Sequence, residues 1–392
     1  MAIPLRGARV LELGGYVAVP FGTQLLGQLG AEVIKVEGPT GDPSRARQIH
    51  FTTNNVGKRS VSIDLKTARG HQVWETLVRS ADVVMQNLDD GATDRLRIGY
   101  DDCRALQPQL VYAQVRGFGA GPHQGAKATN PIIEAMTGLM SITSANGKPG
   151  RQGSPFYDQL AGILAALGVV AALNLADRSD GSGFVEADLY ETALVSLAPR
   201  LAECSLTGEL AGEVWGTAPY DTFQASDGKW IFLGTISDAL WRRFCRAFDL
   251  TGPGSDSTLA TSEQRFARKA EMDELAQKVV GGFASDEAMA KLRAADIPCA
   301  IVANFREVID DPQFAAEEKS YSTTFNGNTV RLPASPIVSR MTQRPSRPRP
   351  PELGEDTRDV LCSLGFSDAD IQRLSANGAI LVHSGAAEQG GL

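Results

Sequence analysis

The sequence predicts an α/β protein in which a parallel β-sheet carries helices on both faces and a smaller α+β domain follows. Three observations carry this prediction. Strand-like and helix-like segments alternate over the first half of the chain, as in doubly wound folds. Near residue 215 the composition shifts to a hairpin pattern and charged helices. At 392 residues, the chain is long enough for about two domains.

The first strand–helix–strand unit is expected at the N-terminus. Residues 8–14 are typical of a strand that ends in a double glycine, residues 20–30 of a helix, and residues 32–36 of a second strand. The glycine turn and an acid about twenty residues later are similar to a dinucleotide-binding fingerprint. That fingerprint needs three glycines at G-x-G-x-x-G spacing, which this turn lacks. The unit therefore supports the fold but only weakly a nicotinamide or methyl-donor cofactor.

Further strands are expected at residues 60–65, 81–86 and 110–115, with helices at 67–80 and 94–106 between them. Ligands of doubly wound proteins collect at the edge of the sheet where the carboxyl ends of the parallel strands lie. Gly14, Asn87 and Gly117 each follow a strand and are expected at that edge.

A Gly/Pro-punctuated loop over residues 150–157 leads to Asp158 and then to a helix that is apolar almost all round. No charge occurs from Leu160 to Leu173, and the stretch is too short for a membrane span, so a fully buried helix is expected. Asp158 has two interpretations. Aspartate is a good helix N-cap, and caps greatly outnumber catalytic carboxylates. A carboxylate in an apolar pocket can instead act as a nucleophile where water is excluded.

The second half of the chain is expected to begin with a turn at 178–183, a strand at 184–189 and a helix from Glu191 to about Gly208. Residues 220–234 are typical of a hairpin with an Asp227-Gly228 turn. The remaining expected elements are helices at 238–249, 262–281 and 286–295, a strand at 298–302, a proline-rich linker at 344–351 and closing helices at 356–377.

Composition excludes several classes of function. The net charge is −8 and no basic stripe with interleaved aromatics occurs, which disfavours nucleic acid as a partner. The five cysteines and four histidines are scattered without ligand spacing, so reduced thiols in a cytoplasmic protein and no metal site are expected. The N-terminus lacks the apolar core of a signal peptide, and no membrane anchor is expected.

Short motifs in one order extend over nearly the whole chain. They are Arg9-Val-Leu-Glu-Leu, Gln28 to Glu37 with Gly41-Asp42-Pro43, Asn55 to Lys66, Ala81 to Asn87, Tyr157-Asp158-Gln-Leu-Ala-Gly162, Asp221 to Trp230, Ile297-Pro298 and Gly354-Glu-Asp-Thr-Arg. By these motifs the chain resembles the class III CoA-transferase family. That family includes formyl-CoA, carnitine and mesaconyl-CoA transferases and, as a divergent branch, α-methylacyl-CoA racemase.

The resemblance implies a Rossmann-like, parallel-sheet large domain formed by both chain ends, a smaller inserted α+β domain, and an interlocked homodimer. The expected boundaries are 1–205 for the N-terminal part of the large CoA-binding domain, 215–325 for the small domain, and 326–392 for a linker and C-terminal helices that return to the large domain. The small-residue helix after Asp158 would then pack near the dimer core.

The resemblance also implies that Asp158 is the catalytic aspartate. It would attack the thioester of an acyl-CoA, form an aspartyl-CoA thioester by way of an anhydride, and pass CoA to a carboxylate acceptor. CoA is thus expected as an acyl-CoA substrate, with no permanently bound cofactor. Positions that line the CoA site of formyl-CoA transferase correspond to Ala18, Leu65, Lys66, Asn87, Arg95 and Lys127, with Lys58 and Arg59 as further candidates.

The chain departs from the family pattern at several positions. The usual Asn-Phe-Arg-Pro-Gly appears as Asn87-Leu-Asp-Asp-Gly91, which puts two acids where a cation is common. The His and Gln of some oxalate enzymes are replaced by Gly15 and Val17, which argues against oxalate. Thr129-Asn130-Pro131 is instead similar to the mesaconyl-CoA enzyme. The resemblance thus favours a branched or unsaturated C4–C5 dicarboxylate, with CoA moving between two molecules or within one.

Two other classes of function stay open. The racemase branch moves an α-proton with a His and an Asp. Its His position falls at or near Thr129, and the nearest histidine here is His123. A CoA-binding protein without catalytic activity, or a nicotinamide enzyme, would share the fold but not the chemistry at Asp158.

Overall fold

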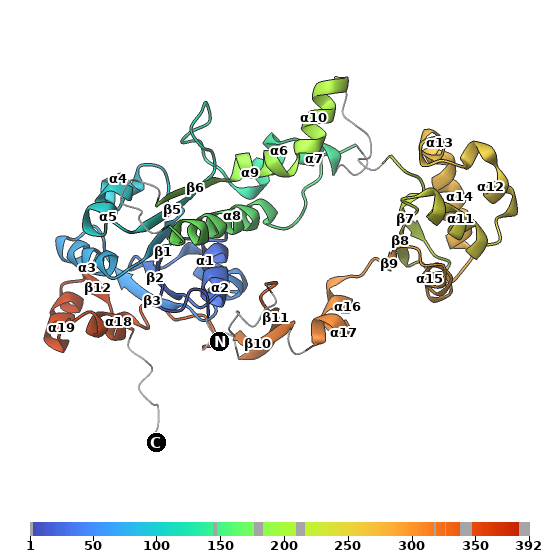
Figure 1. Ribbon diagram of the computed structural model, residues 1–392. Helices are drawn as coiled ribbons and strands as arrows, with labels where there is room; N and C mark the ends of the chain where they lie inside the picture. The colour runs from blue at the N-terminus through green and yellow to red at the C-terminus, as the bar shows by residue number, and fades with distance from the viewer. Residues whose placement is uncertain are drawn as a thin grey trace, which may run out of the picture. The chain divides into compact units, whose positions relative to one another are not determined.

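The computed structural model describes residues 3–143, 147–175, 183–208, 216–316, 319–325, 327–337 and 347–383. Figure 1 shows that the chain forms two compact units. The first comprises Met1–Ala198 together with Ala315–Leu392, and the second comprises Pro199–Phe314.

The first unit is built on a seven-stranded sheet in the order β12-β3-β2-β1-β4-β5-β6. The first six strands of the chain pair in parallel, whereas β12 pairs antiparallel with β3. A large parallel-sheet core in a mixed α/β fold is therefore confirmed. The strands are β1 (Arg9–Leu13), β2 (Glu32–Glu37), β3 (Arg59–Ile63), β4 (Val83–Gln86), β5 (Val111–Arg116), β6 (Phe184–Asp188) and β12 (Ile380–Leu381).

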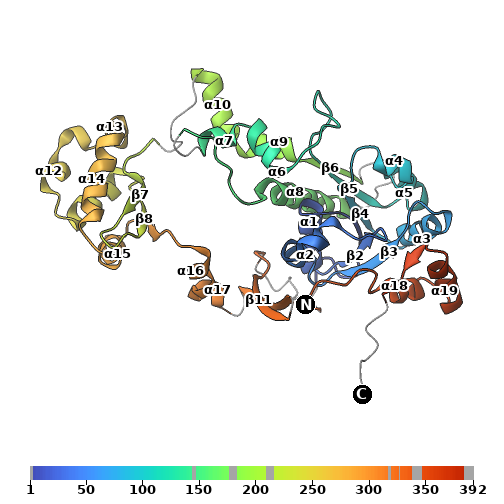
Figure 2. The ribbon, with the colours of Figure 1, turned by 180° about the vertical axis from the view of Figure 1, so that it is seen from behind.

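Helices cover both faces of this sheet (Figures 1 and 2). Successive side chains of a strand point to opposite faces, so Val10 belongs to one core and Leu11 to the other. The core around Val10 is closed by α1 (Ala18–Gln28) and α8 (Phe156–Leu173). The core around Leu11 is closed by α3 (Ala68–Arg79), α5 (Tyr100–Leu106), α18 (Thr357–Ser363) and α19 (Asp368–Ala376).

Several elements differ from the sequence prediction. The single helix expected at 94–106 is two helices, α4 (Ala92–Leu96) and α5, because Arg97 takes a left-handed φ of 53° between them. The helix expected from Glu191 is α9 (Leu189–Ser196) and α10 (Ala198–Thr207). Three helices of the first unit were not predicted: α2 (Gln48–Asn55), α6 (Asn130–Met136) and α7 (Leu139–Ile142).

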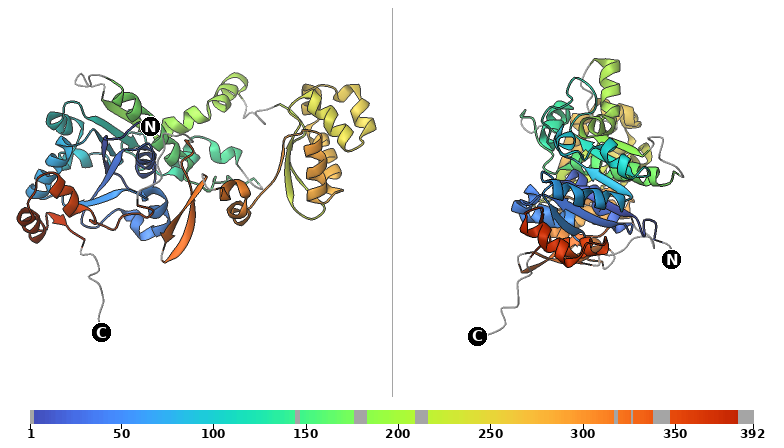
Figure 3. Two further views of the ribbon diagram at one scale, coloured as in Figure 1. Left: turned by 60° about the horizontal axis from the view of Figure 1, so that its bottom comes forward. Right: turned by 90° about the vertical axis from the view of Figure 1, so that its left-hand side faces the viewer.

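A hairpin of β10 (Ser320–Phe325) and β11 (Asn328–Pro333) was also missed; it forms a separate two-stranded sheet (Figure 3). Its signal was present in the sequence, because an Asn-Gly pair between alternating apolar residues is a strong hairpin pattern. The turn residue Gly327 has a φ of 75°, which favours glycine.

The second unit holds the expected hairpin, β7 (Tyr220–Gln224) and β8 (Trp230–Gly234), with β9 (Cys299–Ile301) paired to β8. Buried aromatic side chains such as Trp241 and Phe244 form its core. Its helices are α11 (Asp238–Ala247), α12 (Thr251–Ser255), α13 (Ser262–Ala267), α14 (Lys269–Gly281), α15 (Ser285–Ala294), α16 (Phe305–Asp310) and, at the junction with the first unit, α17 (Pro312–Ala315).

Two expected connections lie partly outside the described residues: the turn at 178–183, up to residue 182, and the proline-rich linker at 344–351, up to residue 346. The described end of that linker is fastened to the fold. Arg347 forms an ion pair with Asp356 at 2.8 Å, and Arg349 forms one with Glu355 at 2.6 Å.

Candidate active site

The site is organised where the order of the strands reverses, between β1 and β4. At such a switch point, the loops after the two strands diverge and leave a crevice for a ligand. Asn87, directly after β4, bridges the two loops. Its Oδ1 accepts a hydrogen bond from Gly15 N at 2.9 Å, and its Nδ2 donates to Gly15 O at 3.1 Å. Asn87 therefore fixes the backbone of the loop that follows β1.

In the β1–α1 loop, residues 14–17, side chains from other elements hydrogen-bond the backbone of Gly14, Gly15 and Tyr16. Lys35 Nζ donates to Gly14 O at 2.7 Å. Tyr16 N donates to Asp42 Oδ1 and Tyr16 O accepts from Asn54 Nδ2, both at 3.4 Å. These contacts hold Tyr16 at a φ of 62°, which is costly for a residue other than glycine. The loop is thus shaped before any ligand binds.

A buried charge cluster lies beneath this loop. Glu12 accepts from Lys35 at 2.7 Å, from Lys58 at 2.6 Å and from Thr23 Oγ1, and Lys35 also contacts Asp42 at 2.8 Å. Burial alone would raise the pKa of Glu12, but the two lysines outweigh it and hold that pKa below its usual value. Opposite charges thus keep Glu12 ionised inside the fold.

Lys58 and Arg59, the two further CoA candidates, are each engaged in an ion pair in the described structure. Lys58 is 2% exposed and also donates to Pro20 O and Asn55 Oδ1. Burial lowers the pKa of Lys58 to about 8, although Glu12 opposes the shift. Arg59 pairs with Glu32 at 2.7 Å. A buried glutamate requires a buried counter-charge, and Lys58 supplies it.

Asp158 is the third residue of α8, and the N-cap position belongs to Pro155. The interpretation of Asp158 as a helix cap is therefore wrong. Among the described residues, no hydrogen bond or ion pair is formed by its carboxyl. Burial raises the pKa of Asp158 to about 6. Asp158 is thus a half-buried carboxyl without a hydrogen-bond or ion-pair partner in the described structure.

A close crossing of α1 and α8 brings Asp158 to the β1–α1 loop. A Cβ added to Gly22 would lie 2.6 Å from Gly162 O, and one added to Gly162 would lie 2.3 Å from Ala18 O. Only glycine allows this approach. Asp158 lies one turn before Gly162, on the same face of α8. The first turns of the two helices therefore meet at the switch point, with Ala18 buried between them.

The other predicted CoA positions lie around the same strand ends. Lys127 is exposed and pairs with Asp89 at 3.3 Å, so it joins the loop after Asn87. Arg95 on α4 and Lys66 after β3 are exposed, and Leu65 packs against the core around Leu11. Asn87 binds the β1–α1 loop at Gly15, and Ala18 lies against Gly162, one turn after Asp158. Leu65, Lys66 and Arg95 lie at other strand ends of the same sheet.

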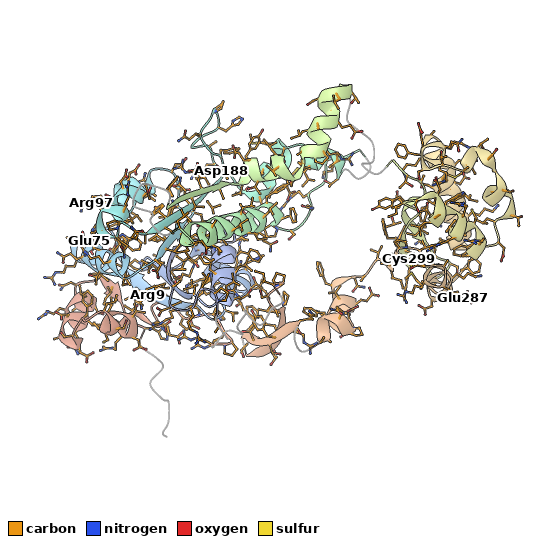
Figure 4. The ribbon with its side chains drawn as sticks, viewed as in Figure 1. Arg9, Glu75, Arg97, Asp188, Glu287 and Cys299 are labelled. Atoms are coloured by element: carbon orange, nitrogen blue, oxygen red, sulfur yellow. The ribbon has the colours of Figure 1, made fainter. Side chains whose placement is uncertain are left out.

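Sequence reasoning missed a second carboxyl with a raised pKa. Asp188, at the end of β6 (labelled in Figure 4), has its pKa raised to about 6 by burial and by the neighbouring Glu186 and Glu191. It sits among other charges, including Arg116, whereas Asp158 does not. The acidic pattern Glu186-Ala-Asp188 and Glu191 was the available signal.

Sequence reasoning named Asn130 only as part of the Thr129-Asn130-Pro131 motif and missed Glu134. Both are buried residues of α6 that hydrogen-bond the segment before Asp158. The available signal was a glutamate four residues after an asparagine on an otherwise apolar helix.

The expectation that α8 is fully buried was wrong. Ala161, Ala165 and Val169 are buried, but Ile163 and Leu167 on the other side are 42% and 61% exposed. In length and composition α8 matches a membrane-spanning helix, and it is the one such helix within the described ranges. Burial follows the side that faces α1 and the sheet, because a single chain provides no cover for the other side.

No group of three or more His, Cys, Asp or Glu side chains suited to a metal ion occurs in the described part of the chain. A cavity of about 730 Å³ lies along α11 and α12 in the second unit, and none of the predicted site residues lines it. The candidate active site is therefore the loop after β1 together with Asp158.

Comparison with known proteins gives a consistent result. Residues 5–357 match CoA-transferase family III. The chain is 31% identical to succinyl-CoA–D-citramalate CoA-transferase of Chloroflexus aurantiacus, over 96% of this chain and 98% of that protein. It is 30% identical to succinate–glutarate CoA-transferase of Agrobacterium fabrum, over 92% and 96%.

Solved structures agree. Rv3272 of Mycobacterium tuberculosis superposes with a TM-score of 0.81 at 28% identity, over 91% of this chain and 98% of that one. A CaiB/BaiF family protein of Brucella suis gives 0.80 at 27% identity, over 93% and 100%. The chain therefore belongs to CoA-transferase family III and is an acyl-CoA:carboxylate CoA-transferase.

Proposed function

We propose that the enzyme moves CoA from an acyl-CoA donor to a C4–C5 dicarboxylic acid through a thioester on Asp158. The observation that carries this proposal is the half-buried carboxyl of Asp158, unpartnered among the described residues, which the α1–α8 crossing brings to the switch point. Relatives named for succinyl-CoA with D-citramalate, glutarate or mesaconate support a dicarboxylate. Gly15 and Val17, in place of His and Gln, argue against oxalate.

The reaction proceeds through four acyl transfers. The Asp158 carboxylate attacks the thioester carbonyl, and CoA leaves as a thiolate with formation of a mixed anhydride. The thiolate then attacks the Asp158 carbonyl, which releases the donor carboxylate and leaves aspartyl-CoA. The acceptor carboxylate attacks this thioester and again expels the thiolate, which finally attacks the acceptor carbonyl and frees Asp158. Every intermediate is an activated acyl group, so water must be excluded.

The β1–α1 loop supplies the groups that stabilise the developing oxyanions. Val17 and Ala18 open α1, and no acceptor for their N–H groups occurs among the described residues. Unpaired N–H groups at a helix start, held in a rigid loop, suit an oxyanion. The proposed CoA contacts are Ala18, Leu65, Lys66, Asn87, Arg95 and Lys127. Asn87 acts in part through the loop, because both ends of its amide already bind Gly15.

We further propose that the enzyme works as the interlocked homodimer implied by its family. The exposed apolar side of α8, with Ile163 and Leu167, supports this because a second copy would remove it from water. A monomer in light scattering would overturn the dimer. The racemase alternative is not favoured: the relatives are named as CoA-transferases, and the ring of His123 packs 5.4 Å from that of Phe118.

The test is the intact mass of the protein after incubation with succinyl-CoA, formyl-CoA and a 2-methylacyl-CoA. The wild type should gain the mass of CoA less one water, and one dicarboxylate should discharge the adduct. Asp158→Ala should give none. Asp188→Ala is the matched control, because its carboxyl has a similar pKa, and it should still form the adduct. Normal turnover by Asp158→Ala would overturn the proposal.

A further inference from the structure

The start of α8 is capped from another helix. Asn130, the first residue of α6, is 4% exposed, and its Oδ1 accepts a hydrogen bond from Tyr157 N at 2.8 Å. Tyr157 N is one of the free N–H groups at the start of α8, and it belongs to the residue before Asp158. The N-cap residue itself, Pro155, contributes no side-chain hydrogen bond.

Glu134 fixes the orientation of the Asn130 amide. It lies one turn further along α6 and is 0% exposed. Its Oε1 accepts from Asn130 Nδ2 at 2.5 Å, and its Oε2 accepts from Gln152 N at 3.1 Å. A carboxylate only accepts, so the NH₂ of Asn130 must face Glu134 and its oxygen must face Tyr157 N. Asn130 Nδ2 also donates to Ser154 O at 3.2 Å, so the segment before Asp158 is held at three points.

Pro155 has a complementary effect. A carboxylate at the third position of a helix commonly bonds back to the N–H of the N-cap residue, as in a capping box. Proline has no N–H, so Asp158 finds no such donor at residue 155. The helix is therefore capped without using the Asp158 carboxyl.

The cost of this arrangement points to a role beyond stability. Glu134 is fully buried, and in the described part of the structure no cation pairs with it. A buried carboxylate without a counter-charge is expensive, and an apolar residue with an ordinary N-cap would stabilise the helix more simply. Departures from local preference of this kind are expected at functional sites.

We propose that Asn130 and Glu134 are positioning residues that cap α8 from outside, and that Pro155 completes the device by leaving the Asp158 carboxyl without a hydrogen bond. This inference rests on the proposed role of Asp158 as nucleophile. Neither Asn130 nor Glu134 touches the reacting atoms; they act through Tyr157 N and the segment before it.

A reversal of the hydrogen-bond polarity tests the pair. Asn130→Asp places a second carboxylate against Glu134 Oε1. Glu134→Gln introduces an NH₂ group that cannot be accommodated: in either amide orientation, an NH₂ of residue 130 or 134 faces the N–H of Tyr157, the N–H of Gln152 or the other NH₂. Each single change should lower kcat about 10- to 100-fold, with KM for the acyl-CoA changed less than about threefold. The double variant restores two of the three contacts, because the introduced aspartate would accept from Tyr157 N and from the introduced glutamine, whose oxygen accepts from Gln152 N; only the donation to Ser154 O is lost. It should recover most of the lost rate.

Asn304→Asp is the matched control. Asn304 likewise accepts from the first N–H groups of a helix, α16, in the second unit. It should leave kcat unchanged. A double variant no faster than the slower single variant, or single variants with lowered thermal stability but normal kcat, would overturn the positioning role.

The same series, followed by intact mass, separates the two proposals. If the wild type and both single variants form the adduct equally well, the positioning role of Asn130 and Glu134 is wrong, but the role of Asp158 as nucleophile stands. Absence of a wild-type adduct removes both. Pro155→Ala, which returns an N–H to the N-cap, should slow adduct formation about 10-fold while the helix stays capped by Asn130. Unchanged adduct formation would contradict the part assigned to Pro155.

Discussion

Glu12, in the central strand β1, and Asp158, in the first turn of α8, are both carboxyls shielded from solvent, but only Glu12 has charged partners. Glu12 is fully buried and bound by two lysines and a threonine. Burial alone would raise its pKa, but the two lysines outweigh burial and lower it. Asp158 has no described partner, and burial raises its pKa to about 6. Burial alone therefore does not decide the role of a carboxyl: partners make Glu12 a structural anion, whereas Asp158 lacks a partner in the described structure, as the proposed nucleophile requires.

The largest effect should separate the two groups by activity. Asp158→Asn should lower kcat at least about 10³-fold, because an amide cannot form the anhydride. Glu12→Gln, assayed below its unfolding temperature, should keep its transfer activity. Steady-state transfer of CoA from succinyl-CoA to a dicarboxylate measures kcat of both variants. A folded but inactive Glu12→Gln would show that Glu12 is needed for the reaction and not only for stability.

Replacement of Glu12, unlike replacement of Asp158, should strongly lower the stability of the fold. Glu12→Gln should destabilise the fold by about 3–5 kcal/mol, because Lys58 loses its buried ion-pair partner. Urea unfolding measures the change. Glu32→Gln is the control: Glu32 is 33% exposed and pairs with Arg9 and Arg59, so less than about 1 kcal/mol is expected. Equal losses in the two variants would refute the contrast between buried and exposed pairs.

Asp158→Asn should stabilise the protein at pH 8 by about 2–3 kcal/mol. The folded pKa of about 6 exceeds the usual 3.8, so ionisation of Asp158 costs stability as pH rises from about 4 through about 6. The advantage of the asparagine should therefore vanish below pH 4. Over the same range wild-type turnover should increase, because the proposed nucleophile is the ionised form of Asp158. A stability difference that does not change with pH would contradict the raised pKa.

The smallest effect concerns the crossing that links the two regions. Gly162→Ala should cost about 1 kcal/mol net: the added Cβ meets Ala18 O, while the better helix propensity of alanine offsets part of the strain. The added methyl group should also push α1 and α8 apart and so slow CoA transfer. Gly27→Ala in α1 is the control and should be neutral or stabilising, because the nearest atom is a side-chain methyl of Val33 at 3.3 Å and no backbone atom lies that close. Similar behaviour of the two variants would argue against a tight crossing at Gly162.

Much of the fold could be predicted because periodicity reports burial within a segment. The apolar runs of β1, β4 and β5 and the amphipathic α3 are local patterns, and they gave the parallel sheet and its helices. The hairpin β10–β11 was missed although its Asn-Gly signal was local, so that failure belongs to the prediction and not to the sequence.

The sequence by itself also determined the candidates: Asp158 at the head of an apolar helix and Asn87 at the end of a strand. It could not assign their partners, because hydrogen bonds between residues such as Asn87 and Gly15 or Asn130 and Tyr157 join segments far apart in the chain. Lys58 was a further candidate for CoA binding, and only the folded sheet places Glu12 beside it. Which charges are satisfied, and that Asp158 has no partner in the described structure, became clear only from the tertiary structure, because both depend on distances set by packing.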